Sequence, residues 1–203
     1  MKISQLRSRE SYDASLKTNV TKLLSLRYPH ILVQNTPETA PQTWHRHLLY
    51  DVYVPSNFGA GPRVWLAKLY AKSPSNLRLA PQWLICQSSK LSPLDRLFLR
   101  PAFSTNIPLS PNTFIMPGNQ RFRLFDFDAQ KALVATKCGF AADSIRHEIE
   151  FRQRRDLPDF VPPLTELAPD AYEEPLLDAV PINRLWTNKA MMRTRTPLQR
   201  VFK

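Results

Sequence analysis

The sequence is poor in glycine and cysteine. Four glycines stand against nineteen prolines in 203 residues. Because proline fixes φ and removes a backbone donor, we expect few long helices or central strands before about residue 110. The two cysteines, Cys86 and Cys138, form no CxxC pair, which excludes a disulfide scaffold and a cysteine zinc site and fits a reducing cytoplasm. No window approaches 18 apolar residues and no apolar leader follows Met1, so we expect a soluble cytoplasmic protein without a membrane segment.

Acidic residues are absent after Asp178. Residues 1–110 carry 14 Lys and Arg against 5 Asp and Glu, residues 111–178 carry 8 against 12, and residues 179–203 carry 6 against none. Basic ends of this kind suit the phosphates of a nucleic acid or an acidic partner protein. The plainer interpretation is a solvated basic surface that a missing acidic partner or domain would cover.

The apolar spacing predicts an α+β protein. With 43% apolar residues, the chain has enough material for a core. The pattern indicates a helix over 10–27, a strand over 48–54, a hairpin of 113–116 and 121–127, a strand over 132–137, a helix over 143–154 and a strand over 172–178. Residues 63–71 fit either a strand or a helix.

The second half of the chain places a lysine and a glutamate where a nucleotide site needs them. Lys137 ends a predicted strand, so the sheet would hold its stem while the ammonium reaches outward. Glu148 lies on the predicted helix whose Ile145 and Ile149 face the sheet, which makes it a better partner for the lysine than Glu150. We therefore expect the side chains of Lys137 and Glu148 to approach within about 4 Å.

These residues occur in a familiar order: a hairpin with Gly118, a strand ending in Lys137, a helix with an Arg-x-Glu-x-Glu pattern, and a Glu-Glu-Pro-Leu-Leu-Asp strand before a hinge. Over about residues 111–185, the chain resembles the small lobe of the aminoglycoside phosphotransferase and choline kinase-like superfamily. The resemblance implies a twisted five-stranded antiparallel sheet crossed by one helix. It also implies ATP and Mg as cofactors, with the ATP phosphates under the hairpin. The binding residues so implied are Gly118, Asn119, Gln120, Lys137 and Glu148.

The chain departs from that superfamily in two respects. Gly118 stands alone where protein kinases have three glycines, so we expect nucleotide binding to be weak or lost. The superfamily's catalytic aspartate, its neighbouring asparagine and its metal-binding aspartate belong to a large lobe after the hinge, and no acidic residue follows Asp178 here. We therefore predict no catalytic residue in this chain.

We accordingly predict three parts: an N-terminal α+β module (1–110), a kinase-like small lobe (111–185), and a basic tail (186–203) that would begin the missing large lobe. The predicted function is that of a truncated or degenerate ATP-dependent phosphotransferase, inactive alone. The alternative is a non-catalytic binding module for an acidic partner protein or nucleic acid. The acidic sign of residues 111–178 does not suit a continuous phosphate-tracking surface and favours the first interpretation.

Two other patterns are weaker. His45 and His47 would lie on one side of a strand as a pair of metal ligands, but no third ligand is near in sequence. Asp95, with a distant Ser and His, suggests a catalytic triad, but no Gly-x-Ser-x-Gly elbow supports one. We therefore predict neither a metal site nor a triad.

Overall fold

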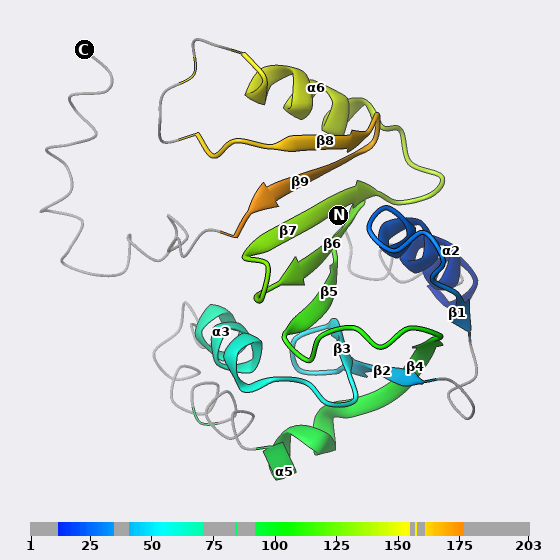
Figure 1. The fold of residues 1–203 in the computed structure, drawn as a ribbon. Coiled ribbons are helices and arrows are strands. Elements are labelled where there is room, and N and C mark those ends of the chain that lie inside the picture. The colour runs from blue at the N-terminus through cyan, green and yellow to red at the C-terminus, as the bar shows by residue number, and fades with distance from the viewer. Residues whose placement is uncertain are drawn as a thin grey trace, which may run out of the picture.

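The computed structural model describes residues 12–34, 41–70, 84, 92–154, 157 and 161–176, and the predicted tail 186–203 lies outside this part. The described residues form an α+β fold around one antiparallel sheet (Figure 1). Its strands are β1 (Val33–Gln34), β2 (Gln42–His47), β3 (Val52–Pro55), β4 (Leu99–Thr105), β5 (Thr113–Pro117), β6 (Arg121–Asp126), β7 (Lys131–Thr136), β8 (Thr165–Ala168) and β9 (Ala171–Pro175). The helices are α2 (Tyr12–Ser25), α3 (Ala60–Tyr70), α5 (Ser92–Asp95), the 3-10 turn η1 (Arg96–Phe98) and α6 (Asp143–Arg152).

The sheet runs without a break through both predicted modules. Its nine strands lie in the order β1-β4-β2-β3-β5-β6-β7-β9-β8. The predicted boundary at 110/111 falls in the loop between β4 and β5, and the pair Tyr53↔Ile115 joins β3 to β5 across it. The last five strands of that order, together with α6, lie within the range 111–185.

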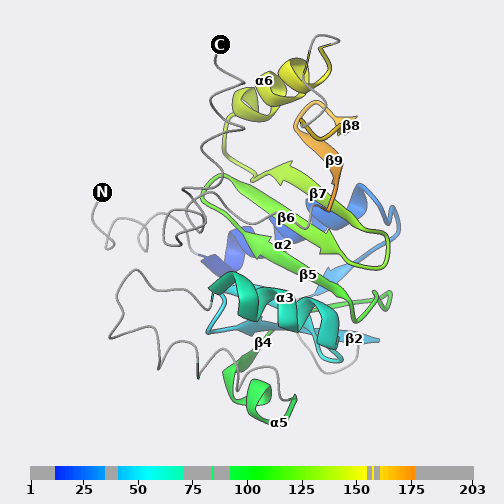
Figure 2. The same ribbon diagram turned by 90° about the vertical axis from the view of Figure 1, so that its left-hand side faces the viewer.

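The helices cover opposite faces of the sheet. Side chains alternate between the two faces along each strand, and the core clusters follow this alternation. On one face, α2 packs through Leu16, Val20, Leu23 and Leu24 on a cluster that includes Phe122. The same cluster includes Ile115, Leu124, Leu133, Ala135 and Ala171. Figure 2 shows α3 in front of the sheet and α2 behind it.

The other face has two separate helix contacts. Trp65 of α3 lies against Phe114, with ring centroids 5.8 Å apart, in a cluster with Val52 and Val54. At the far end of the sheet, Ile145 and Ile149 of α6 pack on one residue of β7 and one of β9. The two strand residues are Val134 and Tyr172.

The proline-rich first half contains more regular structure than we expected. The expectation of few central strands before residue 110 is wrong, since β2 is paired on both sides by β3 and β4. Pro101 is accommodated within β4 at a register irregularity beside Trp44 and His45. Strand β1 pairs with Ser104 and Thr105, so Pro101 lies outside the part of β4 that β1 covers, and an irregular or singly paired position of this kind is where a sheet accepts proline.

Candidate functional site

The turn predicted to lie over phosphates is the tip of the β5–β6 hairpin. The Gly118 N–H donates to the Arg121 carbonyl at 2.7 Å, which closes the turn, and the Gln120 carbonyl accepts from the Lys137 N–H at 2.9 Å. Asn119 and Gln120 are exposed. The predicted turn residues are therefore together, beside the end of β7 where Lys137 begins the next loop.

Lys137 is buried on the α2 side of the sheet. Its side chain lies on the same face of the sheet as Ala135, two residues earlier. Its ammonium lies 5.3 Å from the centroid of the Phe122 ring, which belongs to the cluster packed on α2. Two side chains of α2 hold the adjoining backbone: Lys22 Nζ donates to the Thr136 carbonyl at 2.9 Å, and Asn19 Oδ1 accepts from the Cys138 N–H at 2.6 Å. Helix α2 therefore covers the end of β7 on this face.

Glu148 lies on the opposite face, between α6 and the sheet. Its carboxylate accepts hydrogen bonds from Arg121 Nη1 at 2.5 Å, the Tyr172 hydroxyl at 2.9 Å and Arg152 Nη1 at 3.4 Å. Burial opposes its ionisation, but the bonds from Arg121 and Tyr172 and the charges of both arginines outweigh burial and lower the pKa of Glu148 below its ordinary value. Glu150 points outward instead, so Glu148 is the helix glutamate that faces the sheet.

The predicted ion pair between Lys137 and Glu148 is wrong. Within the described part of the chain, the ion pairs of Glu148 are those with Arg121 and Arg152. The reason lies in strand alternation: Arg121 pairs with Thr136 and shares its face, so the next residue, Lys137, turns to the other face. Sequence order placed the two residues near one another but did not reveal which side of β7 each would use.

Arg152 extends this network along α6. Its Nη1 atom lies 2.6 Å from Glu174 Oε2, and its guanidinium also donates to the Pro162 carbonyl at 2.7 Å. Burial raises the pKa of the Tyr172 phenol, and the carboxylates of Glu174 and Glu148 raise it further. Arg121 and Arg152 thus balance Glu148 and Glu174 in a four-charge cluster.

A second polar cluster is buried in the first half of the chain. His47 Nε2 lies 2.9 Å from Asp95 Oδ1, and Arg63 Nε donates to Asp95 Oδ2 at 3.1 Å. Arg63 Nη2 also donates to the Phe58 carbonyl at 2.7 Å, and the His47 ring stacks on Tyr50 with centroids 4.4 Å apart. The sequence patterns pointed to His47 and Asp95 separately and gave no sign of Arg63. No spacing signal relates residues from β2, α3 and α5.

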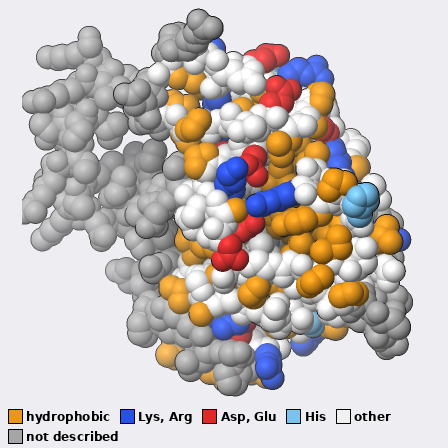
Figure 3. Space-filling model, in the orientation of Figure 1, with side chains coloured by type: hydrophobic (Ala, Val, Ile, Leu, Met, Phe, Trp, Pro, Cys, Tyr) orange, Lys and Arg blue, Asp and Glu red, His pale blue; other side chains and the backbone are white. Residues whose placement is uncertain are grey.

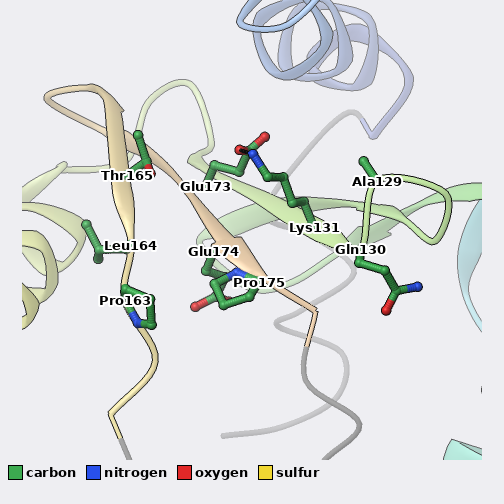
Figure 4. A pocket seen from close by; sticks show the side chains of 9 residues that line it. All are labelled: Ala129, Gln130, Lys131, Pro163, Leu164, Thr165, Glu173, Glu174 and Pro175. Atoms are coloured by element: carbon green, nitrogen blue, oxygen red, sulfur yellow. Dashed lines mark hydrogen bonds and ion pairs between the residues drawn. The ribbon is translucent and has the colours of Figure 1, made fainter. Parts of the chain in front are cut away.

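One cavity of about 220 Å³ lies where β8 and β9 begin to separate (Figure 4). The cavity is lined by Ala129, Gln130, Lys131, Pro163, Leu164, Thr165, Glu173, Glu174 and Pro175. Its charged groups are already paired, because Lys131 Nζ lies 2.5 Å from Glu173 Oε1 and Glu174 bonds Arg152. None of the predicted site residues lines it.

The described residues contain no cluster of three or more His, Cys, Asp or Glu side chains able to hold a metal ion. Among them, no helix has the length and apolar character needed to cross a membrane. They carry 15 Lys and Arg against 12 Asp and Glu, whereas the remaining residues carry 13 against 5. Figure 3 shows basic and acidic side chains next to one another near the centre of one face.

Comparison with known proteins found no matching family model, no matching curated protein and no matching solved structure.

Proposed function

We propose that this chain is a degenerate ATP-dependent phosphotransferase, similar to small-molecule kinases in the layout of residues 111–176, that transfers no phosphate by itself. The support for the layout is the sequence of elements: the β5–β6 hairpin, β7, helix α6, then β8 and β9, with five adjacent strands and one helix packed on them. The inward orientation of Glu148 on α6 agrees with it.

The observation that carries the loss of activity is the separation of Lys137 from Glu148 by the sheet. A phosphotransferase needs a fixed cation at the nucleotide phosphates, held by a carboxylate. Here α2 covers the end of β7 at Lys137. The carboxylate of Glu148 accepts hydrogen bonds from Arg121, Arg152 and Tyr172 instead. Residues 179–203 contain no Asp or Glu that could act as a base or bind Mg²⁺.

The test is an assay for ADP release and phosphate transfer with ATP, Mg²⁺ and a panel of amino-alcohol and aminoglycoside acceptors. We expect no turnover above buffer, and no change with Lys137→Met. Turnover that Lys137→Met abolishes would show that the lysine serves a nucleotide site in solution. Turnover that survives the substitution would indicate an active site elsewhere in the chain.

A second candidate function is a non-catalytic binding module for an acidic partner protein or nucleic acid. The distribution of charge favours it: the described residues have a net charge of +3 and the remaining residues +8. Elution from a heparin column tests this candidate. Replacing Arg193, Arg195 and Arg200 by Gln should lower the eluting salt concentration if the tail binds polyanions. The matched control replaces Lys17, Arg96 and Arg100, which are exposed on the described part.

A further inference from the structure

Three exposed leucines lie together at one end of the fold, and we call them the leucine tip. Leu48 is 50% exposed, Leu94 41% and Leu97 68%. The Leu48 N–H donates to the Phe98 carbonyl at 2.9 Å, so the turn after β2 lies beside the 3-10 turn η1. Single exposed leucines are common on protein surfaces, but several at one place mark a surface that binds a protein or a membrane.

The buried carboxylate of Asp95 determines which way the leucine tip points. Asp95 ends α5, and η1 follows it directly, while His47 and Arg63 hold its side chain in the interior. At about 100° per residue, Leu94 and Leu97 lie on the side of this helical segment away from Asp95, about 60° from each other. Both ribbon views place α5 at the lower end of the described fold (Figures 1 and 2). The leucine tip is therefore a projection, and none of its residues lines the cavity beside β8 and β9.

The charged residues beside the leucine tip are mainly basic. Arg96 lies within the same helical segment, Arg100 follows it on β4, and both are exposed. Arg46 and Arg100 lie directly opposite each other on β2 and β4, and like charges in this arrangement destabilise a sheet. Asp51 balances Arg46, whose Nη2 lies 2.6 Å from the Asp51 carboxylate. The charge that remains at this end is positive, so it favours an anionic partner.

We propose that the leucine tip binds an anionic lipid surface, with its leucines at the boundary between headgroups and acyl chains and with Arg96 and Arg100 at the lipid phosphates. The interface of a bilayer offers an apolar phase and anions side by side, which matches a projecting apolar tip flanked by arginines. A nucleic acid offers anions without an apolar phase, and two exposed arginines alone attract a polyanion only weakly. A second copy of the chain, joined tip to tip, would bring like charges together. The inference concerns the first half of the chain and is independent of any phosphotransferase ancestry.

Co-sedimentation of the full chain with vesicles tests the contact, with phosphatidylcholine alone and with phosphatidylcholine containing phosphatidylserine. We expect binding to the anionic vesicles, and we expect Leu97→Ser to weaken it by about 5- to 10-fold, since that leucine is the most exposed of the three. Arg96→Gln should weaken it by about fivefold through loss of one surface charge. The matched control is Leu167→Ser on β8, at the other end of the sheet and 42% exposed, which should change binding by less than about twofold.

The proposal is wrong if the wild-type chain does not sediment with anionic vesicles, if it binds both kinds of vesicle equally, or if Leu97→Ser and Leu167→Ser weaken binding equally. The basic tail is tested separately by replacing Arg193, Arg195 and Arg200 with Gln. If that variant loses all binding while Leu97→Ser keeps it, the tail is the lipid contact and the proposal is wrong. Analytical ultracentrifugation covers self-association: a dimer that Leu97→Ser dissociates, without vesicle binding, would assign the tip to a second copy and overturn the proposal. Thermal unfolding shows that each variant is folded, which is expected because the replaced side chains are exposed.

Discussion

Replacing Asp95 with alanine removes the carboxylate that joins β2, α3 and α5. The side chains of His47, Asp95 and Arg63 are exposed by only 0%, 2% and 9%. Without Asp95, the buried Arg63 guanidinium keeps its hydrogen bond to the Phe58 carbonyl, at 2.7 Å, but has no carboxylate beside it among the described residues. The His47 ring also loses its Nε2 contact, while its buried Nδ1 atom already lacks a partner in the described structure.

The expected cost is large because one substitution leaves a charge and an imidazole uncompensated in the interior. Breaking a buried ion pair from one side costs about 3–5 kcal/mol, against a total stability of about 5–15 kcal/mol for a typical domain. Most of this cost is the burial of unpaired Arg63, so replacing Asp95 by Leu and Arg63 by Met together should recover a large part of it.

Urea unfolding followed by tryptophan fluorescence measures these differences. At a slope of about 2 kcal/mol per molar urea, the midpoint of Asp95→Ala should fall by about 2 M. The control is Glu150→Ala, whose side chain is 63% exposed, and its stability should stay within about 0.5 kcal/mol of wild type. A loss below about 1 kcal/mol for Asp95→Ala, or a double variant less stable than the single one, would refute the reasoning.

Four further predictions concern other parts of the fold. The fold lowers the pKa of Glu148 below 4.5, so the ionised carboxylate stabilises the folded state above pH 4.5. Glu148→Gln should therefore lower the free energy of unfolding, measured in urea at pH 7, by about 1–2 kcal/mol. The difference from wild type should vanish as the pH falls through the folded-state pKa. Ultraviolet titration should show one fewer tyrosine ionising well above pH 10 in Tyr172→Phe than in the wild type, since burial and nearby carboxylates raise the pKa of Tyr172. Burial also raises the pKa of Tyr28, so the measurement is the difference between the two proteins, and an unchanged number of late-ionising tyrosines would contradict the assignment. Gly139→Ala should destabilise by about 1–2 kcal/mol, because φ is +86° there with open space around it, and an unchanged melting temperature would count against this. Phe114→Ala should cost about 3–5 kcal/mol, because that ring is fully buried and stacks on Phe125 at 4.8 Å; a cost under 1 kcal/mol would mean that the cluster is not packed as described.

Local patterns predicted the second half of the sheet well. The hairpin, the strand over 132–137, the helix over 143–154 and the strand over 172–178 correspond to β5 with β6, β7, α6 and β9. Each has a clear period of apolar residues and a turn or proline at its end. In the first half, the predicted helix over 10–27 is α2, and the segment over 63–71 is helical in α3.

Prediction failed where pairing partners decide the structure. The strand over 48–54 begins only at Val52, because residues 48–51 turn, with Asp51 at φ 51°. We placed His45 and His47 on a strand, and they do lie on β2, but the polar look of His45, Arg46 and His47 gave no bounds for it. His47 is enclosed by Asp95 and two aromatic rings. The site was half predicted for the same reason: Glu148 faces the sheet as expected, but helix α2, more than a hundred residues earlier, determines what covers Lys137.

The attachment of α2 to the end of β7 has a consequence for synthesis on the ribosome. The hydrogen bond from the Cys138 N–H to Asn19 joins residues that are 119 positions apart. At about 5–20 residues per second, the ribosome needs roughly 6–24 s to synthesise the segment between them. During that interval, the apolar stripe of Leu16, Val20, Leu23 and Leu24 lacks its contacts with β6 and β7. During synthesis this stripe therefore offers a chaperone a binding segment. Synonymous codons that slow translation between residues 24 and 138 should prolong the exposure and lower the yield of folded protein.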